Sequence, residues 1–120
     1  MSNIVKINGT DVQVLEYEGQ RVATLAQVDV VHGRPDGTAP RNFNRNKKRL
    51  VEGEDYRKFS ADEFRSRFPW VLPERTTEDV PIVFESGYLM LVKSFKDDLA
   101  WQVQRQLVNG YFRASAPQKL

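Results

Sequence analysis

The sequence has no cysteine, which excludes disulfide bonds, thiolate nucleophiles and zinc sites built on cysteine. It also lacks long apolar runs. None approaches the ~18 residues of a membrane-spanning helix, and residues 1–6 contain no apolar signal-peptide core. We therefore expect a cytoplasmic protein with no membrane partner, whose fold depends on packing alone.

Histidine and the common catalytic motifs are equally scarce. The single histidine, His32, stands just before Gly33, where it is better placed to complement the carboxyl end of a helix than to bind metal or transfer protons. No phosphate-binding loop, dinucleotide-binding glycine pattern, zinc-protease motif or nucleophile elbow occurs. Acidic clusters at residues 52–55, 78–79 and 97–98 are explained by turns and first helical turns. We expect no enzymatic activity, no metal and no cofactor.

Length and composition predict one small folded domain. The chain has 120 residues, 40% of them hydrophobic, which is enough apolar content for a single core. Its mixture of strand and helix patterns places it in the α+β class. We assign residues 1–114 to this domain and residues 115–120 to a tail or linker.

Positive charge is concentrated in one segment of the chain. Residues 34–49 contain six basic residues and one acidic residue, a net charge of +5, whereas the whole chain carries +2 and the remainder therefore −3. The basic residues are Arg34, Arg41, Arg45, Lys47, Lys48 and Arg49. A solvated helix usually mixes charges of both signs, so a local excess of one sign is typical of an element that contacts phosphates.

The basic segment predicts a helix from residue 40 to about residue 51. Thr38 is a suitable N-cap, and Pro40 fits the first turn, where a missing N–H does no harm. At ~100° per residue, Phe43 and Leu50 fall on one side and the basic residues on the other. The first side should anchor the helix, and the second should face double-stranded DNA. The candidate DNA-binding residues are Arg34, Arg41, Arg45, Lys48 and Arg49, for phosphates or guanine edges, and Asn42, Asn44 and Asn46, for adenine edges.

The amino-terminal part of the chain predicts β-structure. β-branched runs over residues 4–7 and 12–15 flank Asn8 and Gly9, a strong signal for a hairpin. Residues 21–23 predict a further short strand.

A second helix is predicted just before the basic one. Thr24 and Gln27 have capping-box spacing at the start of residues 25–32, and Gly33 suits the end of that helix. A turn-rich link over residues 33–37 then leads to the basic helix. This order predicts a helix-turn-helix-like core with a slightly long turn.

The carboxyl-terminal half predicts further strands and packing helices. The expected strands cover residues 56–59 and 80–84, and the expected helices cover residues 60–68, 87–93 with Ser86 as cap, and about 97–113.

Several segments of the chain resemble a known family. ESGYLMLV at residues 85–92 and WQVQRQLVNGYF at residues 101–112 are similar to its ESG-Y/L-x-x-L and W-Q-x-x-L-V-x-x-Y-F patterns. TLAQV at residues 24–28 and NFNRNKKRL at residues 42–50 also fit. Over roughly residues 21–113 the chain resembles the phage "open reading frame six" amino-terminal domain family, which is related to the KilA-N and Bro-N domains. The resemblance implies DNA binding by an antirepressor-type transcriptional regulator of a phage or prophage in a bacterial cell, and it implies no reaction.

The final predicted helix has more apolar surface than one packing face requires. One stripe contains Leu99, Val103 and Leu107, and a second, about 100–200° away, contains Trp101, Val108 and Phe112. The second stripe is either buried between two layers of the domain or is the seam of a homodimer. Helix-turn-helix proteins often bind paired half-sites as two-fold dimers, which is compatible with a seam.

The main expectation is therefore sequence-specific binding of double-stranded DNA, and two alternatives stay open. The first is a protein-interaction module that antagonises a phage repressor by direct binding, with the basic helix against an acidic surface. The second is an enzyme that acts on nucleic acid, for which the acidic clusters are the sole support. Salt-dependent binding to random duplex DNA would favour DNA binding over the first alternative. Absence of metal-dependent cleavage would remove the second.

Overall fold

Strands and helices alternate along the chain in the mixed order of an α+β fold. The computed structural model describes residues 4–69 and 71–114, so the predicted tail at residues 115–120 lies outside the described residues. The strands are β1 (Ile4–Ile7), β2 (Thr10–Gln13), β3 (Leu15–Tyr17), β4 (Gln20–Thr24), β5 (Tyr56–Phe59) and β6 (Val80–Val83). The helices are α1 (Leu25–His32), α2 (Thr38–Asn46), α3 (Ala61–Arg67), α4 (Glu85–Leu91) and α5 (Asp98–Leu107), with 3-10 turns η1 (Lys47–Arg49) and η2 (Val92–Ser94) and a π-helical turn η3 (Val108–Phe112). Within the described part of the chain, no helix combines the length and the apolar character needed to cross a bilayer.

The predicted amino-terminal hairpin is present and forms its own two-stranded sheet, but its second strand covers Thr10–Gln13 and not residues 12–15 as expected. β1 and β2 pair antiparallel, with Ile7 opposite Thr10. The turn residues Asn8 and Gly9 have φ angles of 51° and 80°. A two-residue turn with positive φ at both positions matches the twist of the strands, and Asn and Gly tolerate that conformation best. The Asn-Gly pair therefore sets the register of this hairpin.

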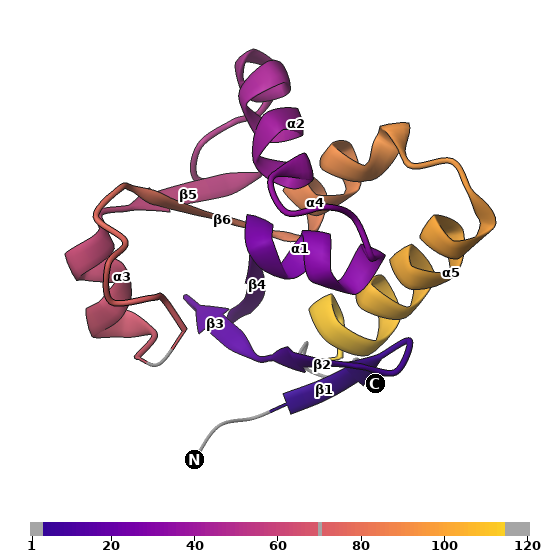
Figure 1. Ribbon diagram of the computed structural model, residues 1–120, viewed down its shortest axis with the longest axis horizontal. Helices are drawn as coiled ribbons and strands as arrows, with labels where there is room; N and C mark the ends of the chain where they lie inside the picture. Colours follow the sequence, from indigo (N-terminus) through magenta and orange to yellow (C-terminus); the bar gives the residue numbers. More distant parts are fainter. Residues whose placement is uncertain (1–3, 70, 115–120) are drawn as a thin grey trace.

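The remaining strands form an antiparallel sheet in the order β3-β4-β6-β5 (Figure 1). The expected strands at residues 21–23, 56–59 and 80–84 are confirmed in this sheet as β4, β5 and β6. The short strand β3 was not expected. It exists because Glu18 and Gly19 form a second turn with positive φ, which pairs β3 with β4.

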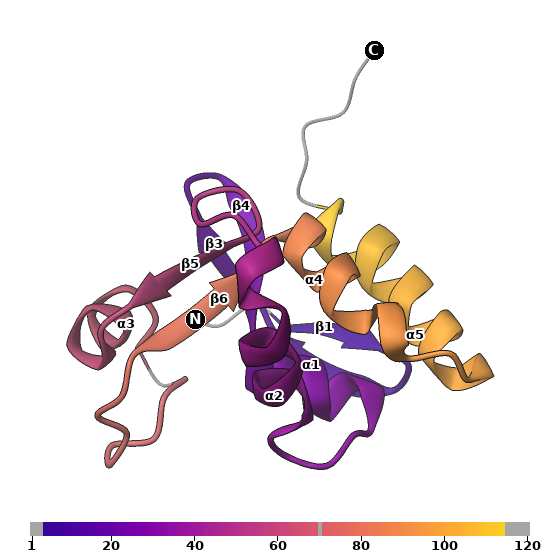
Figure 2. The same ribbon diagram turned by 90° about the horizontal axis from the view of Figure 1, so that it is seen from above.

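The four-stranded sheet separates two hydrophobic clusters. In β6, Ile82 belongs to a cluster with Phe64 and Phe68 from α3 and its carboxyl end, whereas Val83 belongs to the cluster formed with α1, α2, α4 and α5. Figure 2 shows α3 on one side of β5 and β6 and these four helices on the other. The alternation of neighbouring strand residues thus gives each face of the sheet its own core.

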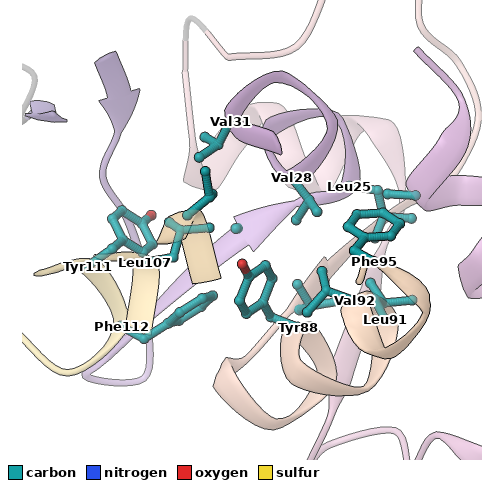
Figure 3. Packing of buried hydrophobic residues seen from close by; sticks show 14 of the residues in the cluster. Leu25, Val28, Val31, Tyr88, Leu91, Val92, Phe95, Leu107, Tyr111 and Phe112 are labelled. Atoms are coloured by element: carbon teal, nitrogen blue, oxygen red, sulfur yellow. The ribbon is translucent and has the colours of Figure 1, made fainter. Parts of the chain in front are cut away.

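Tyr88 of α4 lies at the centre of the larger cluster, with its hydroxyl turned toward α1 (Figure 3). The hydroxyl oxygen is 2.6 Å from Nε2 of His32, and the ring centroid is 5.3 Å from that of Phe112. Burial raises the pKa of Tyr88, so this hydroxyl stays protonated. Tyr88 therefore joins α1, α4 and η3 in one packed unit.

The hydroxyl of Tyr111 connects η3 to the four-stranded sheet. It donates a 2.6 Å hydrogen bond to the carbonyl oxygen of Val22 and accepts a 3.0 Å bond from the N–H of Leu15. Leu15 begins β3, immediately after the chain leaves the first sheet at Val14. This one side chain therefore fixes the point where the backbone passes from the hairpin to the larger sheet.

The last helix was expected to run from about residue 97 to residue 113, and within that range α5 ends at Leu107 and is followed by the π-helical turn η3. A π turn contains more residues than an α turn, so it moves Phe112 from the outward line of Trp101 toward the core. Phe112 is 6% exposed, whereas Trp101 is 65% exposed and Val108 is half-buried. The second apolar stripe predicted for this helix is therefore divided, and Phe112 belongs to the core. Leu99, assigned to the first stripe, is 44% exposed.

The start of α4 packs closely on the turn before β5. Ser86 does not cap this helix as expected, because the N-cap is Phe84 and the Ser86 hydroxyl instead donates a 2.6 Å hydrogen bond to the buried carboxylate of Asp55. A Cβ atom at Gly87 would lie 2.9 Å from the carbonyl carbon of Asp55. The Glu-Ser-Gly sequence thus gives this helix a polar bond and a close approach to the turn.

Candidate nucleic-acid interface

Asp29 of α1 fixes the position of the predicted recognition helix, α2. Its side chain is 2% exposed, and its two carboxylate oxygens accept hydrogen bonds from the N–H of Ala39 at 2.8 Å and of Gly37 at 3.0 Å. Burial raises the pKa of this carboxyl, while the hydrogen bonds oppose that rise. These N–H groups at the amino end of α2 are the ones that could otherwise bind a phosphate. Any phosphate contact must therefore come from other parts of the helix.

The boundaries of α2 differ from the predicted ones. Gly37, with φ of 95°, is the N-cap, and Thr38 lies inside the helix, where its hydroxyl donates to the carbonyl of Pro35. The α-helix ends at Asn46 and continues only as η1, short of residue 51. The helix ends early because of the turn that follows it. There the Asp55 carboxylate accepts a 2.9 Å hydrogen bond from the N–H of Val51, so the backbone at Val51 turns away from the helix axis.

The two sides of α2 have opposite character, as the sequence predicts. Ala39 and Phe43 are buried, and the Phe43 ring meets Tyr56 edge-to-face at 5.0 Å between centroids. The exposed basic residues of this region are Arg41 and Arg45 on α2 and Lys47, Lys48 and Arg49 on η1. In residues 4–69 and 71–114, none of these five forms an ion pair with a carboxylate. We call these five residues the basic surface.

The three asparagines of α2 lie in different environments. Asn44 is exposed. Asn42 is half-buried, and its Nδ2 lies 3.4 Å from both the Leu91 carbonyl oxygen and Ser94 Oγ. Asn46 donates a 2.9 Å hydrogen bond to the carbonyl of Asn42, one turn earlier. Of the three candidates for adenine contacts, only Asn44 has a side chain that is both exposed and without a hydrogen bond among the described residues.

Arg34 is already engaged within the protein. Its guanidinium forms a 2.6 Å ion pair with Asp97 and lies over the ring of Phe95, 4.2 Å from the centroid. Hydrogen bonding to its own backbone and then the charge of Arg34 lower the pKa of Asp97. Arg34 therefore connects the link after α1 to the segment before α5, and its charge is paired with Asp97, unlike those of the basic surface.

Two exposed lysines near α2 were missed by the sequence analysis. Lys93 lies in η2 next to Ser94, and Lys96 follows three residues after Lys93. The contact between Asn42 and Ser94 places this segment beside α2. Neither lysine has an ion-pair partner among the described residues. More than forty residues separate them from the basic segment, so no sequence signal connected the two.

The opposite side of α2 borders a cleft of about 720 Å³, whose lining away from the helix includes two acidic residues of the loop before β6 and Lys58 of β5. Asn44 and Lys47 line the cleft on the helix side, and Glu78 and Asp79 line it on the side of the loop before β6. The guanidinium of Arg65 positions this loop by donating hydrogen bonds to three of its carbonyl groups. The acceptors are the carbonyl oxygens of Pro73, Glu74 and Thr76, at 2.6, 2.8 and 2.7 Å. The surroundings of α2 are thus basic toward η2 and acidic toward this loop.

His32 plays a different role from the one expected. His32 is buried. This burial and, to a smaller extent, the positive charge of Arg34 lower its pKa to about 4. A neutral imidazole cannot complement a helix carboxyl end by charge. His32 instead packs with Tyr88 and Phe95 in the core.

Comparison with known proteins gives one result that covers most of the chain. No curated protein and no solved structure matches the sequence significantly. The sequence profile of the ORF6N domain matches residues 12–94, which include α1, α2 and α4. Because this match covers more than half of the chain, the protein belongs to the ORF6N domain family.

Proposed function

We propose that this domain binds double-stranded DNA, with α1 and α2 as a helix-turn-helix unit and α2 as the recognition helix. The observation that carries the proposal is the basic surface, five exposed cations on one short segment without an ion-pair partner among the described residues. Cations placed together in this way need a counter-charge, and a phosphate backbone supplies a dense row of negative charges.

The structure favours separate roles for the two parts of the basic surface. Arg41 and Arg45 lie on the side of α2 opposite the buried Phe43, where a helix inserted in the major groove presents its side chains to base edges. Asn44 is the asparagine best placed to join them. The three cations of η1 lie past the end of the helix, a position suited to phosphates at the edge of the groove.

The charges around α2 also favour one direction for the DNA. Lys93 and Lys96 extend the positive surface on the side of η2, whereas Glu78 and Asp79 would repel phosphates on the side of the loop. We infer that the duplex backbone runs from η1 across η2 and avoids the loop before β6. Membership of the ORF6N family supports a role as an antirepressor-type regulator of a phage or prophage.

Binding to a random duplex at several salt concentrations tests the proposal. If about four or five phosphates are neutralised, log K against log[salt] should have a slope of about −4, because each contact contributes roughly −0.9. Lys93→Gln with Lys96→Gln should bring the slope closer to zero by about 1–2. Arg75→Gln makes the same kind of charge change on the acidic loop and should leave the slope unchanged. Because Arg75→Gln removes one charge and the lysine pair removes two, an effect of Arg75→Gln half as large as that of the pair would contradict the inferred path.

Selection from a pool of random duplexes tests sequence specificity. We expect one sequence to be enriched, and Asn44→Ala should weaken its binding by about 1–3 kcal/mol at one A·T pair. Failure to enrich any sequence would reject specific recognition. Absence of binding at low salt would reject DNA altogether and favour a protein partner with an acidic surface. Recovery of intact duplex in the presence of Mg²⁺ is expected, and cleavage would contradict a purely binding role.

A further inference from the structure

α5 lies at one edge of the molecule (Figure 2). Ala100, Val103 and Leu107 are buried and define the inner side of this helix. Trp101, on the outer side, is 65% exposed, the largest value for any large hydrophobic residue in the described part of the chain. An isolated exposed apolar side chain is ordinary, but an exposed tryptophan beside other apolar atoms is a frequent anchor of protein interfaces.

Trp101 lines a shallow groove between α4 and the segment formed by α5 and η3. The groove has a volume of about 330 Å³. Leu89 of α4, Val108 of η3 and Trp101 itself form its apolar lining, and its other lining residues are polar or charged, namely Gln104, Arg105, Asn109 and Arg113. Leu89 and Val108 are half-buried, and each packs against the larger hydrophobic cluster. The groove is thus large enough to accept an aromatic side chain presented by another molecule.

Two opposite charges flank Trp101 on the same helix face. Asp98 precedes it by three residues and Arg105 follows it by four, and both are exposed. They are seven residues apart, which is about 10 Å along the axis and within about 20° of the same direction. Neither has an ion-pair partner in residues 4–69 and 71–114.

This arrangement of charges is complementary to itself. When two copies of a helix lie antiparallel about a two-fold axis near Trp101, Asp98 of each copy faces Arg105 of the other. Two equal ion pairs then flank the two tryptophans. A parallel pairing would instead place Asp98 against Asp98 and Arg105 against Arg105, which is unfavourable.

We propose that the outer face of α5 binds a second copy of this chain in the antiparallel arrangement, with Trp101 inserted toward the groove of the partner and two reciprocal Asp98–Arg105 ion pairs beside it. The interface lies on α5, η3 and α4 and uses none of the five residues of the basic surface. It is independent of the proposed function, and its test requires no DNA.

Sedimentation of the full chain over a range of concentrations tests this interface. Trp101→Ala should shift the dimer toward monomer. Asp98→Lys and Arg105→Glu, each alone, should raise the dissociation constant about tenfold, because each change replaces both ion pairs of the symmetric dimer with like-charge contacts. The double variant restores opposite charges in the reversed sense and should recover to within a few-fold of the original value.

Two outcomes would overturn the proposal. The first is a chain that remains monomeric at about 1 mM, where even weak association becomes visible. The second is a double variant that associates no better than the single variants, which would contradict the antiparallel register. Because Asp98→Lys also places a positive charge in the first turn of α5, the melting temperature of every variant is measured alongside. The double variant carries the same helix penalty, so recovered association cannot arise from greater stability.

Discussion

The carboxylate of Asp29 in α1 accepts a 2.8 Å hydrogen bond from the backbone N–H of Ala39 in α2. Its second oxygen accepts a hydrogen bond from the N–H of Gly37, so one buried side chain satisfies two backbone donors at the amino end of the next helix. α2 has no acidic residue in its own first turn, and Asp29 supplies that negative charge from a neighbouring helix. The relative position of α1 and α2 therefore depends on one polar contact as well as on apolar packing.

Replacing Asp29 by Asn should destabilise the fold. The side chain keeps its shape, but its NH₂ group would face the N–H of either Gly37 or Ala39, and one donor would lose its acceptor. The expected loss is about 1–3 kcal/mol of unfolding free energy, the cost of an unsatisfied buried donor. Urea denaturation measures it. Asp36→Asn, an exposed change in the same link, is the control and should have little effect. Equal stability of both variants would show that Asp29 does not hold α2.

His32 should make the stability of the protein depend on pH. Its folded pKa of about 4 lies below the ordinary value of 6.5, because burial disfavours the charged imidazole. A group with a depressed folded pKa contributes its stability above the unfolded pKa and loses it as the pH falls through the folded pKa. Wild type should therefore lose roughly 3 kcal/mol from this source between pH 6.5 and 4.

The variant His32→Gln isolates this contribution, since glutamine does not titrate and still offers a hydrogen bond to Tyr88. Unfolding free energies of the two proteins should differ most at neutral pH and converge on acidification. A constant difference from pH 7 to pH 4 would show that His32 is not buried in its neutral form.

Local signals in the sequence were sufficient for much of this fold. Asn8-Gly9 predicted a hairpin, and Thr24 with Gln27 predicted a capping box that is present at the start of α1. Each of these features involves residues within a few positions of one another. Phe43 was also placed correctly, because helical periodicity alone separates the apolar side of α2 from the charged one.

Features that depend on distant parts of the chain were not predicted. In the sequence, Asp29 is indistinguishable from any polar residue of a helix, because its contact with Ala39 exists only once the turn between them has formed. Lys93 becomes part of the surroundings of α2 only through the contact of Ser94 with Asn42. The π turn that buries Phe112 has no local sequence signal that we can identify. The environment of each of these residues depends on tertiary packing, and the periodicity of the sequence gives no information about that packing.

Gly87→Ala should destabilise the packing of α4 on the turn before β5. The added Cβ would lie 2.9 Å from the carbonyl carbon of Asp55, so backbone must move to admit it. A cost of about 1–3 kcal/mol is typical of such overpacking. Gly110→Ala is the matched control, because its Cβ would lie 3.6 Å from Cδ1 of Ile7, an ordinary contact. Thermal melting should separate the two variants clearly, and similar melting temperatures would refute the close approach of α4.

The last prediction concerns the two sides of α2, which should respond to substitution in different ways. Phe43 is 3% exposed and packs edge-to-face on Tyr56, so Phe43→Ala should lower the unfolding free energy by about 3–5 kcal/mol through lost burial and a residual cavity. Arg45 is exposed and has no ion-pair partner among the described residues, so Arg45→Ala should melt close to wild type.

The defect of Arg45→Ala should appear in DNA binding. A phosphate contact would be lost equally for all sequences, with the salt slope reduced by ~1, whereas a guanine contact would be lost selectively, by about 1–3 kcal/mol at one base pair. Melting temperature and binding measured on both variants decide between these outcomes. If Arg45→Ala unfolds the domain, or if Phe43→Ala abolishes binding while melting like wild type, α2 does not present its basic side to DNA.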